Sequence, residues 1–232
     1  ALAGRKYGLA VANGSLALDI AYAALDISKG DEVIVPTFTI ISCITHLLRV
    51  GAVPVFVDCD AVTFNMKIDQ VAERITPKTK AILAVHIYGL PVDMDPLLQL
   101  SEQFGIAIVE DAAEAHGLRY KNRICGSFGV LSTFSFYANK HVTCGEGGMI
   151  LTDCSQLAER IRSLRNLCFD ERRTFRHAEL GWNARLTNLQ AAIGLAQLEK
   201  LRGTISRKID LGKEYNKLME NMTDIQMPIV ND

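Results

Sequence analysis

Short apolar segments alternate with helix-forming segments along most of the chain, and this alternation restricts the fold more than any other feature of the sequence. Strands that alternate with helices through short connections form a mostly parallel sheet with helices on both faces. We therefore predict an α/β fold. The predicted strands cover residues 7–12, 32–36, 53–58, 81–85, 106–109 and 149–152. The predicted helices cover residues 16–25, 41–50, 68–75, 94–104 and 155–167.

An aspartate and a lysine stand where such a sheet carries chemistry. Asp111 follows the apolar strand 106–109, and open α/β sheets bind ligands at the carboxyl ends of their strands. Lys140 ends a strand-like segment, residues 134–140, and the glycine-rich turn 145–148 follows it. This arrangement suits a pyridoxal phosphate enzyme, in which the lysine forms a Schiff base and the carboxylate pairs with the pyridinium nitrogen. The alternative is that Asp111 caps a loop and Lys140 is a solvated amine.

A second candidate site lies where the strand 7–12 leads into the helix 16–25. The turn between them contains Asn13, Gly14 and Ser15. Strand, glycine turn and helix N-terminus form a seat for a phosphate group, because unpaired N–H groups and the helix dipole point at the anion. Taken alone, the same three residues also fit an ordinary turn with an N-cap.

The composition argues against several classes of protein. With a net charge of -1, the chain has no electrostatic reason to bind nucleic acid or an anionic membrane. No apolar run approaches the roughly 20 residues of a membrane span, and the N-terminus lacks the pattern of a signal peptide. The six cysteines occur singly, without the Cys/His spacing of a zinc site, so we predict no metal. We expect a soluble, cytoplasmic protein with reduced cysteines.

Three motifs, taken as a set, carry a family resemblance. They are EDAAEAHG at residues 110–117, FSFYANK at 134–140 and GEGGM at 145–149. Together they resemble the DegT/DnrJ-type sugar aminotransferases, pyridoxal phosphate enzymes that aminate nucleotide-linked keto sugars. The stretch 134–149 is most similar to the enzymes of this family that make 4-amino-4,6-dideoxy sugars of the perosamine and viosamine type. The resemblance implies the large domain of a fold-type-I aminotransferase.

The resemblance also implies roles around the cofactor ring. Lys140 would hold the cofactor covalently and then move the proton between substrate and cofactor, while Asp111 would pair with the ring nitrogen. Ala113 would lie against one ring face, and Glu114 would face the ring hydroxyl, where many relatives have glutamine. Ile40 stands where the family usually has an aromatic residue over the other ring face. It either contacts the ring without stacking or belongs to the core.

For the cofactor phosphate, the resemblance implies hydrogen bonds from Gly14, Ser15 and Ser135. In the family, the asparagine at the position of Asn183 reaches the phosphate bound by the neighbouring subunit, which implies a homodimer with shared active sites. A run of arginines further suggests either a solvated surface or a contact with a nucleotide diphosphate. These arginines are Arg160, Arg162, Arg165, Arg172, Arg173 and Arg176.

The implied activity is transamination, because dehydratases of the family replace the lysine at position 140 by histidine. L-glutamate would donate the amino group, and a nucleotide-linked keto sugar of the 4-keto-6-deoxy class would accept it. We expect residues 1–186 to form the cofactor-binding domain. Residues 187–232 should form a long helix that leads to a small C-terminal domain, absent or truncated here. The alternatives are a regulatory protein that binds pyridoxal phosphate or a sugar nucleotide without turnover, and a purely structural α/β domain.

Overall fold

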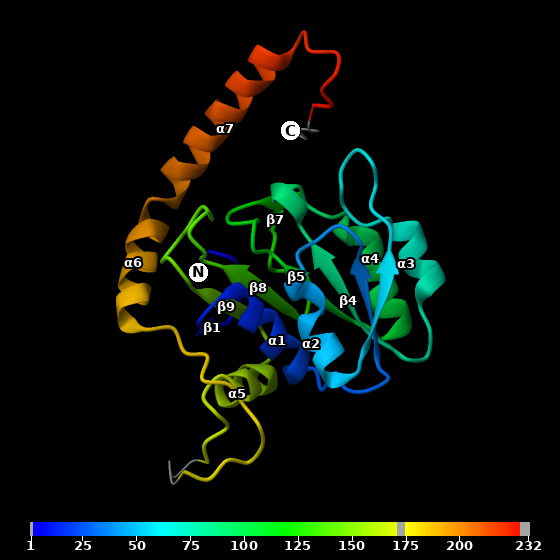
Figure 1. Ribbon diagram of the computed structural model, residues 1–232, viewed down its shortest axis with the longest axis vertical. Helices are drawn as coiled ribbons and strands as arrows, with labels where there is room; N and C mark the ends of the chain where they lie inside the picture. Colours follow the sequence, from blue (N-terminus) through cyan, green and yellow to red (C-terminus); the bar gives the residue numbers. More distant parts are fainter. Residues whose placement is uncertain (1, 171–174, 228–232) are drawn as a thin grey trace.

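A computed structural model describes residues 2–170 and 175–227 of the chain, and its central feature is a seven-stranded sheet (Figure 1). The neighbouring pairs from β8 to β3 are parallel, whereas β9 pairs antiparallel with both β1 and β8. The predicted α/β fold with a mostly parallel sheet is therefore confirmed. In order across the sheet, the strands are β1 (Tyr7–Val11), β9 (Gly148–Thr152), β8 (Leu131–Ser135), β5 (Ala107–Asp111), β4 (Thr79–Val85), β2 (Glu32–Pro36) and β3 (Val53–Val57).

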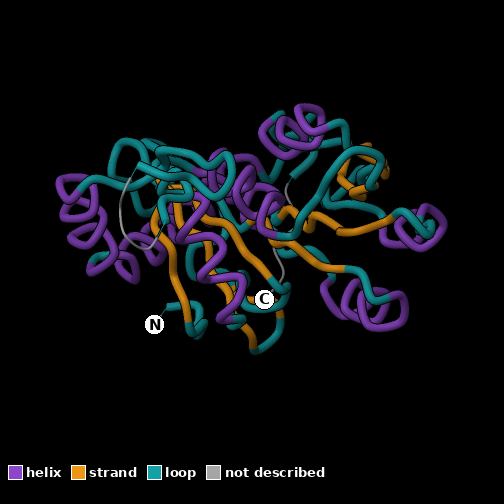
Figure 2. Tube along the Cα trace, turned by 90° about the horizontal axis from the view of Figure 1, so that it is seen from below, coloured by secondary structure: helices purple, strands orange, loops and turns teal. Residues whose placement is uncertain are grey.

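Helices cover both faces of this sheet (Figures 1 and 2). Strand β2 shows why both faces must be covered. Val33 and Val35 pack in the core cluster on one face, while Ile34 packs in the cluster on the other. Because successive strand residues point to opposite faces, a strand with consecutive apolar residues is buried from both sides. One face carries α1 (Gly14–Ala24), α2 (Ser42–Val50) and α5 (Ser155–Leu164), and the other carries α3 (Ile68–Arg74) and α4 (Met94–Phe104).

The carboxyl ends of the central strands meet at one edge of the sheet. Asp111, the last residue of β5, pairs with Val85 at the end of β4. Ser135 ends β8 and pairs with Gly148, which in turn pairs with Val11 at the end of β1. Because α1 begins shortly after β1, its N-terminus lies at the same edge as Asp111 and Ser135.

The segment with Lys140 differs from the predicted strand over residues 134–140, which is wrong from residue 136 onward. Strand β8 ends at Ser135, and the chain then turns, with the Lys140 N–H donating to Tyr137 O at 3.0 Å. The partner strand β9 begins at Gly148, opposite Ser135, so the ladder ends there although aromatic residues continue beyond it. Lys140 therefore lies in a turn above the sheet edge rather than in a strand.

Two consecutive helices follow the sheet and run along one flank of the protein and past it (Figure 1). They are α6 (Asn188–Glu199), which Thr187 caps through a capping box, and α7 (Leu201–Met219). The single long helix predicted here is thus interrupted at Lys200. The Lys200 N–H donates to Gln197 O, a tighter three-residue turn than an α-helix makes.

Two smaller elements follow the carboxyl ends of β4 and β5, and the sequence predicted neither of them. A one-turn helix, η1 (Ile87–Gly89), follows β4, and a hairpin of β6 (Arg119–Tyr120) and β7 (Arg123–Ile124) comes after β5. Within the described residues, no helix combines the length and the apolar character that crossing a membrane requires.

Candidate active site

A cleft at the carboxyl edge of the sheet brings together eight of the nine residues that the sequence predicted for a cofactor site. It has two adjoining lobes of about 350 and 520 Å³, and the larger one reaches the N-terminus of α1. Asn183, the ninth residue, is exposed and lies outside both lobes. Both lobes are lined by Ile40, Asp111, Ala113, Glu114 and Lys140, and the larger one also by Gly14, Ser15 and Ser135.

Asp111 is a buried residue of this cleft, only 5% exposed. Its Oδ1 accepts the Ala113 N–H at 3.0 Å, and its Oδ2 accepts the Cys43 thiol at 3.5 Å. Burial raises the pKa of the Asp111 carboxyl, and its hydrogen bonds offset this effect only in part. A carboxylate has about four acceptor positions, and these two donors occupy about half of them. Asp111 is therefore suited to a cationic partner that enters the cleft.

Lys140 and Glu114 form an ion pair inside the cleft. Lys140 Nζ lies 3.0 Å from Glu114 Oε1, and the two side chains are 17% and 33% exposed. The other carboxylate oxygen, Oε2, accepts the Tyr88 N–H at 2.8 Å. Tyr88 has a φ of 51°, in the left-handed region that aromatic residues rarely adopt, and the bond to Glu114 helps to hold it there. Glu114 thus fixes the lysine and one wall of the cleft at the same time.

The larger lobe ends at the N-terminus of α1, which Asn13 caps with its side chain. A Cβ on Gly14 would lie 2.9 Å from Ser135 Cβ, so only glycine lets this helix approach β8 so closely. Ser15 Oγ lies 2.7 Å from Ser42 Oγ, at the start of α2. Because N–H groups of a first helical turn lack helical partners, this lobe with its serine hydroxyls suits an anion.

Glu110, the neighbour of Asp111, has a structural role that the sequence did not reveal. Its fully buried carboxylate accepts three backbone N–H groups of the loop 126–129 at 2.6 to 2.7 Å. It also lies 3.3 Å from His86 Nε2, and His86 Nδ1 accepts the Val92 N–H, which places the ring proton on the side of Glu110. Burial raises the pKa of the Glu110 carboxyl, but these hydrogen bonds outweigh it and lower the pKa. Glu110 anchors the loop behind β5.

The first turn of α2 contributes two further residues, Ser42 and Cys43. Ser42 is hydrogen-bonded to Ser15, which lines the lobe that suits an anion, and Cys43 contacts Asp111. The sequence pattern identified this segment only as a helix. A small polar residue at the start of a helix that follows a strand end was the one signal available, and by itself it is weak.

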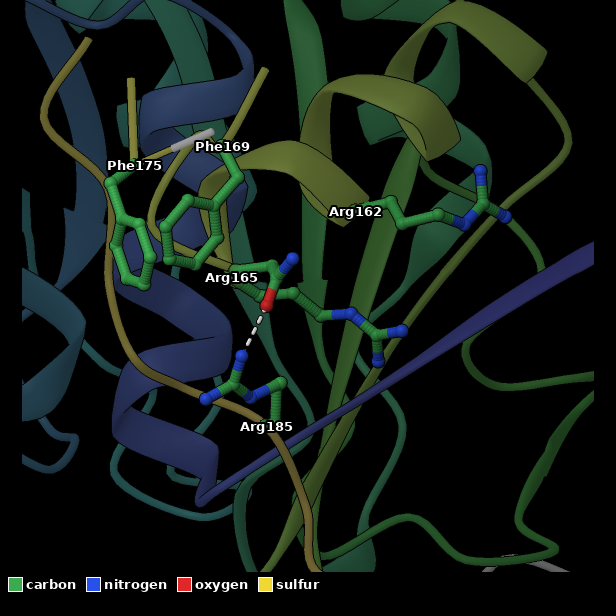
Figure 3. A pocket seen from close by; sticks show the side chains of 6 residues that line it. Arg162, Arg165, Phe169, Phe175 and Arg185 are labelled. Carbon is green, nitrogen blue, oxygen red and sulfur yellow. Dashed lines mark hydrogen bonds between the residues drawn. The ribbon is translucent and has the colours of Figure 1, made fainter. Parts of the chain in front are cut away.

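A second hollow, of about 530 Å³, shares no lining residue with the cleft (Figure 3). Arg162 and Arg165 come from the end of α5, and Arg185 donates to Asn166. Burial, and then the charges of the other two arginines, lowers the pKa of Arg165. Figure 3 shows the three guanidinium groups apart from one another, so they do not form a single anion-binding fork.

The other predicted site residues lie elsewhere. Asn183 accepts a hydrogen bond from Arg185 at 2.9 Å and is open to solvent in this chain. Arg160, from the basic run, is an ion-pair partner of Asp26 and Glu179. Arg172 and Arg173 lie outside the described residues.

Comparison with known proteins extends the resemblance to the full length of the chain. GDP-perosamine synthase of Escherichia coli O157:H7 is 43% identical over 220 residues, which are 95% of this chain and 60% of that protein. A UDP-N-acetyl-3-dehydro-alpha-D-glucosamine 3-aminotransferase of Acidithiobacillus ferrooxidans is 43% identical over 201 residues, 86% of this chain and 54% of that protein. The crystal structure of S. venezuelae DesV with a ketimine intermediate has a TM-score of 0.89 and 38% identity, and covers 95% of this chain and 59% of that one.

This chain thus spans between half and two thirds of the length of these relatives. The structural neighbours confirm the fold-type-I aminotransferase architecture. All residues from 1 to 232 match one family model. The chain belongs to the DegT/DnrJ/EryC1/StrS aminotransferase family.

Proposed function

We propose that this chain is the cofactor-binding part of a pyridoxal phosphate-dependent aminotransferase that aminates a nucleotide-linked keto sugar. One observation carries the proposal. A single cleft combines a buried carboxylate, Asp111, an amine, Lys140, and a helix N-terminus flanked by serine hydroxyls. The family and the sugar aminotransferases among the relatives support the same activity.

The residues of the cleft fit the polar parts of pyridoxal phosphate. Its phosphate suits the N-terminus of α1, where Gly14 leaves room and the hydroxyls of Ser15 and Ser135 line the lobe. Its ring nitrogen suits the buried carboxylate of Asp111, which favours the protonated form. Its carbonyl suits the amine of Lys140. We infer that these residues hold the cofactor.

Three further residues would complete the site. Ala113 and Ile40 would lie on the two sides of the ring, and the small side chain of Ala113 leaves the space that a flat ring needs. Ile40, which is 63% exposed, offers an apolar surface without the stacking that an aromatic residue would add. Glu114 would lie near the ring hydroxyl, where either group must be protonated to avoid repulsion between two anions.

Bound in this way, pyridoxal phosphate would supply a carbonyl that condenses with amines and a ring that accepts the electrons of a broken C–H bond. Asp111 holds the proton on the ring nitrogen by pairing with the charged form. The amine of Lys140 would hold the cofactor and would then serve as the base that moves a proton at the carbon bearing the amino group. Glu114, whose Oε1 lies 3.0 Å from Nζ, would stabilise the protonated form of the lysine.

We further propose L-glutamate as the amino donor and a 4-keto-6-deoxy sugar nucleotide as the acceptor. The relatives named as GDP-perosamine synthases support this acceptor class. The relative named as a 3-aminotransferase supports the competing proposal, amination at the third carbon of the sugar. Product analysis with both keto sugar classes would separate the two.

We propose a homodimer as the active unit, with Asn183 of the partner subunit on the cofactor phosphate. Asn183 is exposed and lies outside the cleft of its own chain, as this arrangement requires. Residues 1–186 would form the cofactor-binding domain, and residues 187–232 would lead away from it. None of the 12 residues of α6, all of them described, is buried in this chain. Because many are apolar, this supports contact with a second subunit or another part of the protein.

An absorbance spectrum of the chain with pyridoxal phosphate, before and after L-glutamate, tests the proposed function. We expect a visible band that glutamate removes, with release of 2-oxoglutarate. Lys140→Ala should abolish the visible band and the release of 2-oxoglutarate. Lys29→Ala, at an exposed position, should retain the band and the release. A band that glutamate leaves unchanged would favour a regulatory protein that binds the cofactor without turnover. The absence of a band would refute the role of Lys140 and favour a structural domain.

A further inference from the structure

Cys43 is a fully buried cysteine in the first turn of α2, and its thiol contacts Asp111. The Sγ atom lies 3.5 Å from Asp111 Oδ2 and 3.2 Å from Thr39 Oγ1. Burial, and then the charge of Asp111, raises the pKa of the Cys43 thiol well above its ordinary value. The thiol therefore keeps its proton and serves as a donor.

The backbone of Cys43 holds the sulfur in place. The Cys43 carbonyl accepts the Tyr22 hydroxyl at 2.9 Å, and Tyr22 is itself fully buried in α1. The Cys43 N–H donates to Ile40 O at 3.0 Å. Helix α2 thus carries the sulfur, and α1 fixes it through Tyr22. A group that orients another side chain needs such rigid support.

The two donors to Asp111 act on different oxygens. Ala113 donates its N–H to Oδ1 at 3.0 Å, and Cys43 donates to Oδ2 at 3.5 Å. One hydrogen bond would leave the carboxyl group free to rotate about its Cβ–Cγ bond, whereas two bonds on different oxygens fix its plane. The remaining acceptor positions of the Asp111 carboxylate then keep a fixed direction.

We propose that Cys43 is a positioning residue, which orients the Asp111 carboxylate for the ring nitrogen of the bound cofactor. This inference rests on the proposed function. A thiol suits the role because it is a weak donor. It fixes the direction of the carboxylate but leaves most of its negative charge available to the protonated ring. The hydroxyl of a serine would give the same direction with a stronger bond.

Three substitutions separate this hydrogen bond from simple packing. Cys43→Ala removes the donor, and Cys43→Ser retains one at the same place. Cys125→Ala is the matched control, because Cys125 is also fully buried but lies in a separate core cluster. Cys125→Ala removes the same side-chain volume at a position without contact to Asp111. Its effect on binding therefore measures the contribution of packing alone.

The first measurement is the Kd for pyridoxal phosphate, from absorbance titration of the wild-type chain and the three variants. We expect Cys43→Ala to raise the Kd about 3- to 10-fold, the loss that one hydrogen bond to a buried group produces. It should also shift the absorbance maximum of the bound cofactor, since the ring nitrogen is then less firmly protonated. Cys43→Ser and Cys125→Ala should stay within about twofold of the wild type.

The second measurement uses the cofactor-free protein. An infrared difference spectrum between the wild type and Cys43→Ser isolates the S–H stretching band of Cys43. In an Asp111→Asn background this band should move to higher wavenumber, because a neutral amide accepts a hydrogen bond more weakly than a carboxylate. This readout is independent of activity and of cofactor binding.

Two results together support the inference. Cys43→Ala binds pyridoxal phosphate more weakly while Cys43→Ser restores the binding, and the S–H band depends on Asp111. An unchanged Kd in Cys43→Ala, or a band that Asp111→Asn leaves in place, would overturn it while the proposed function stands. An equal loss in Cys125→Ala would assign the effect to packing and overturn it as well. If the wild-type chain takes up no pyridoxal phosphate, the proposed function fails and the inference fails with it.

Discussion

The substitution Glu110→Gln tests whether the carboxylate behind the cleft holds this edge of the sheet together. In the wild type, Oε1 accepts the N–H groups of Phe128 and Gly129 at 2.7 Å. Oε2 accepts the Gly126 N–H at 2.6 Å and lies 3.3 Å from His86 Nε2. Glutamine has the same shape but replaces one oxygen by an NH2 group, so one pair of donors would face another donor. Rotation of the amide by half a turn exchanges the pairs and leaves the conflict in place.

The magnitude follows from these contacts. The buried Gly126 N–H loses its acceptor, which costs about 1 to 3 kcal/mol. The two bonds to the remaining oxygen lose their charged acceptor, and each is weakened by about 1 kcal/mol. The free energy of unfolding should therefore fall by about 3 to 5 kcal/mol, a large part of the roughly 5 to 15 kcal/mol of a typical domain.

Urea denaturation of the cofactor-free chain, followed by far-ultraviolet circular dichroism, measures this loss. We expect the midpoint to fall by about 1 to 2 M, for a slope of about 3 kcal/mol per molar urea. The control Glu102→Gln, on the exposed face of α4, should keep the wild-type midpoint. The pKa of Glu110 lies below its ordinary value of 4.5, so its contribution is complete above that pH and is lost as the pH falls further. A midpoint within about 0.2 M of the wild type at neutral pH would refute the reasoning.

Three more substitutions test other parts of the site and the fold. Asp111→Asn should raise the melting temperature of the cofactor-free chain at neutral pH but not near pH 3.8, because burial raises the pKa of Asp111 and its ionised form costs stability above that pH. A gain confined to acidic pH would contradict this sign. Gly14→Ala would place a Cβ 2.9 Å from Ser135 Cβ and should weaken pyridoxal phosphate binding about tenfold in a titration, whereas an unchanged Kd would mean that the anion seat adjusts. Gly212→Ala, inside α7 with no atom near the added Cβ, should raise the free energy of unfolding by about 0.5 to 1 kcal/mol in thermal unfolding, and a loss would show that this face is closely packed.

Hydrophobic patterning located most of the elements, because local periodicity decides where an apolar face must lie. The predicted helix 94–104 and the predicted strand 32–36 coincide with α4 and β2. The strand over residues 134–140 failed because its end depends on a distant partner. Gly148 is where β9 begins, and a strand without a partner stops whatever its own composition favours. The break between α6 and α7 at Lys200 likewise has no mark in the local pattern.

In the candidate site, too, the sequence predicted the residues of local motifs and missed those whose contacts depend on distant parts of the chain. Residues in recognisable motifs, such as Asp111, Glu114 and Lys140, do gather around one cleft, although their roles remain predictions. Cys43 could not be found in this way, because from the sequence it is one more apolar position of a helix. Its contact with Asp111 exists only once α2 packs beside the end of β5. Asn183 lies outside the cleft of its own chain, so its role depends on a second subunit.

Glu110 and Asp111 are adjacent carboxylates at the end of one strand, yet they differ in what they can still bind. Strand geometry turns them to opposite faces of the sheet. Glu110 accepts three backbone N–H groups and contacts His86, so its hydrogen-bonding capacity is filled and its pKa is lowered. Asp111 has two donors, one of them a weak thiol, and its pKa is raised. A buried carboxylate with unfilled acceptor positions stabilises an incoming cation, whereas a filled one stabilises the fold. The cleft lies on the face of Asp111. Hydrophobic patterning by itself does not distinguish the two acids, because the loop whose N–H groups bind Glu110 begins 16 residues later in the chain, and only the family resemblance singled out Asp111.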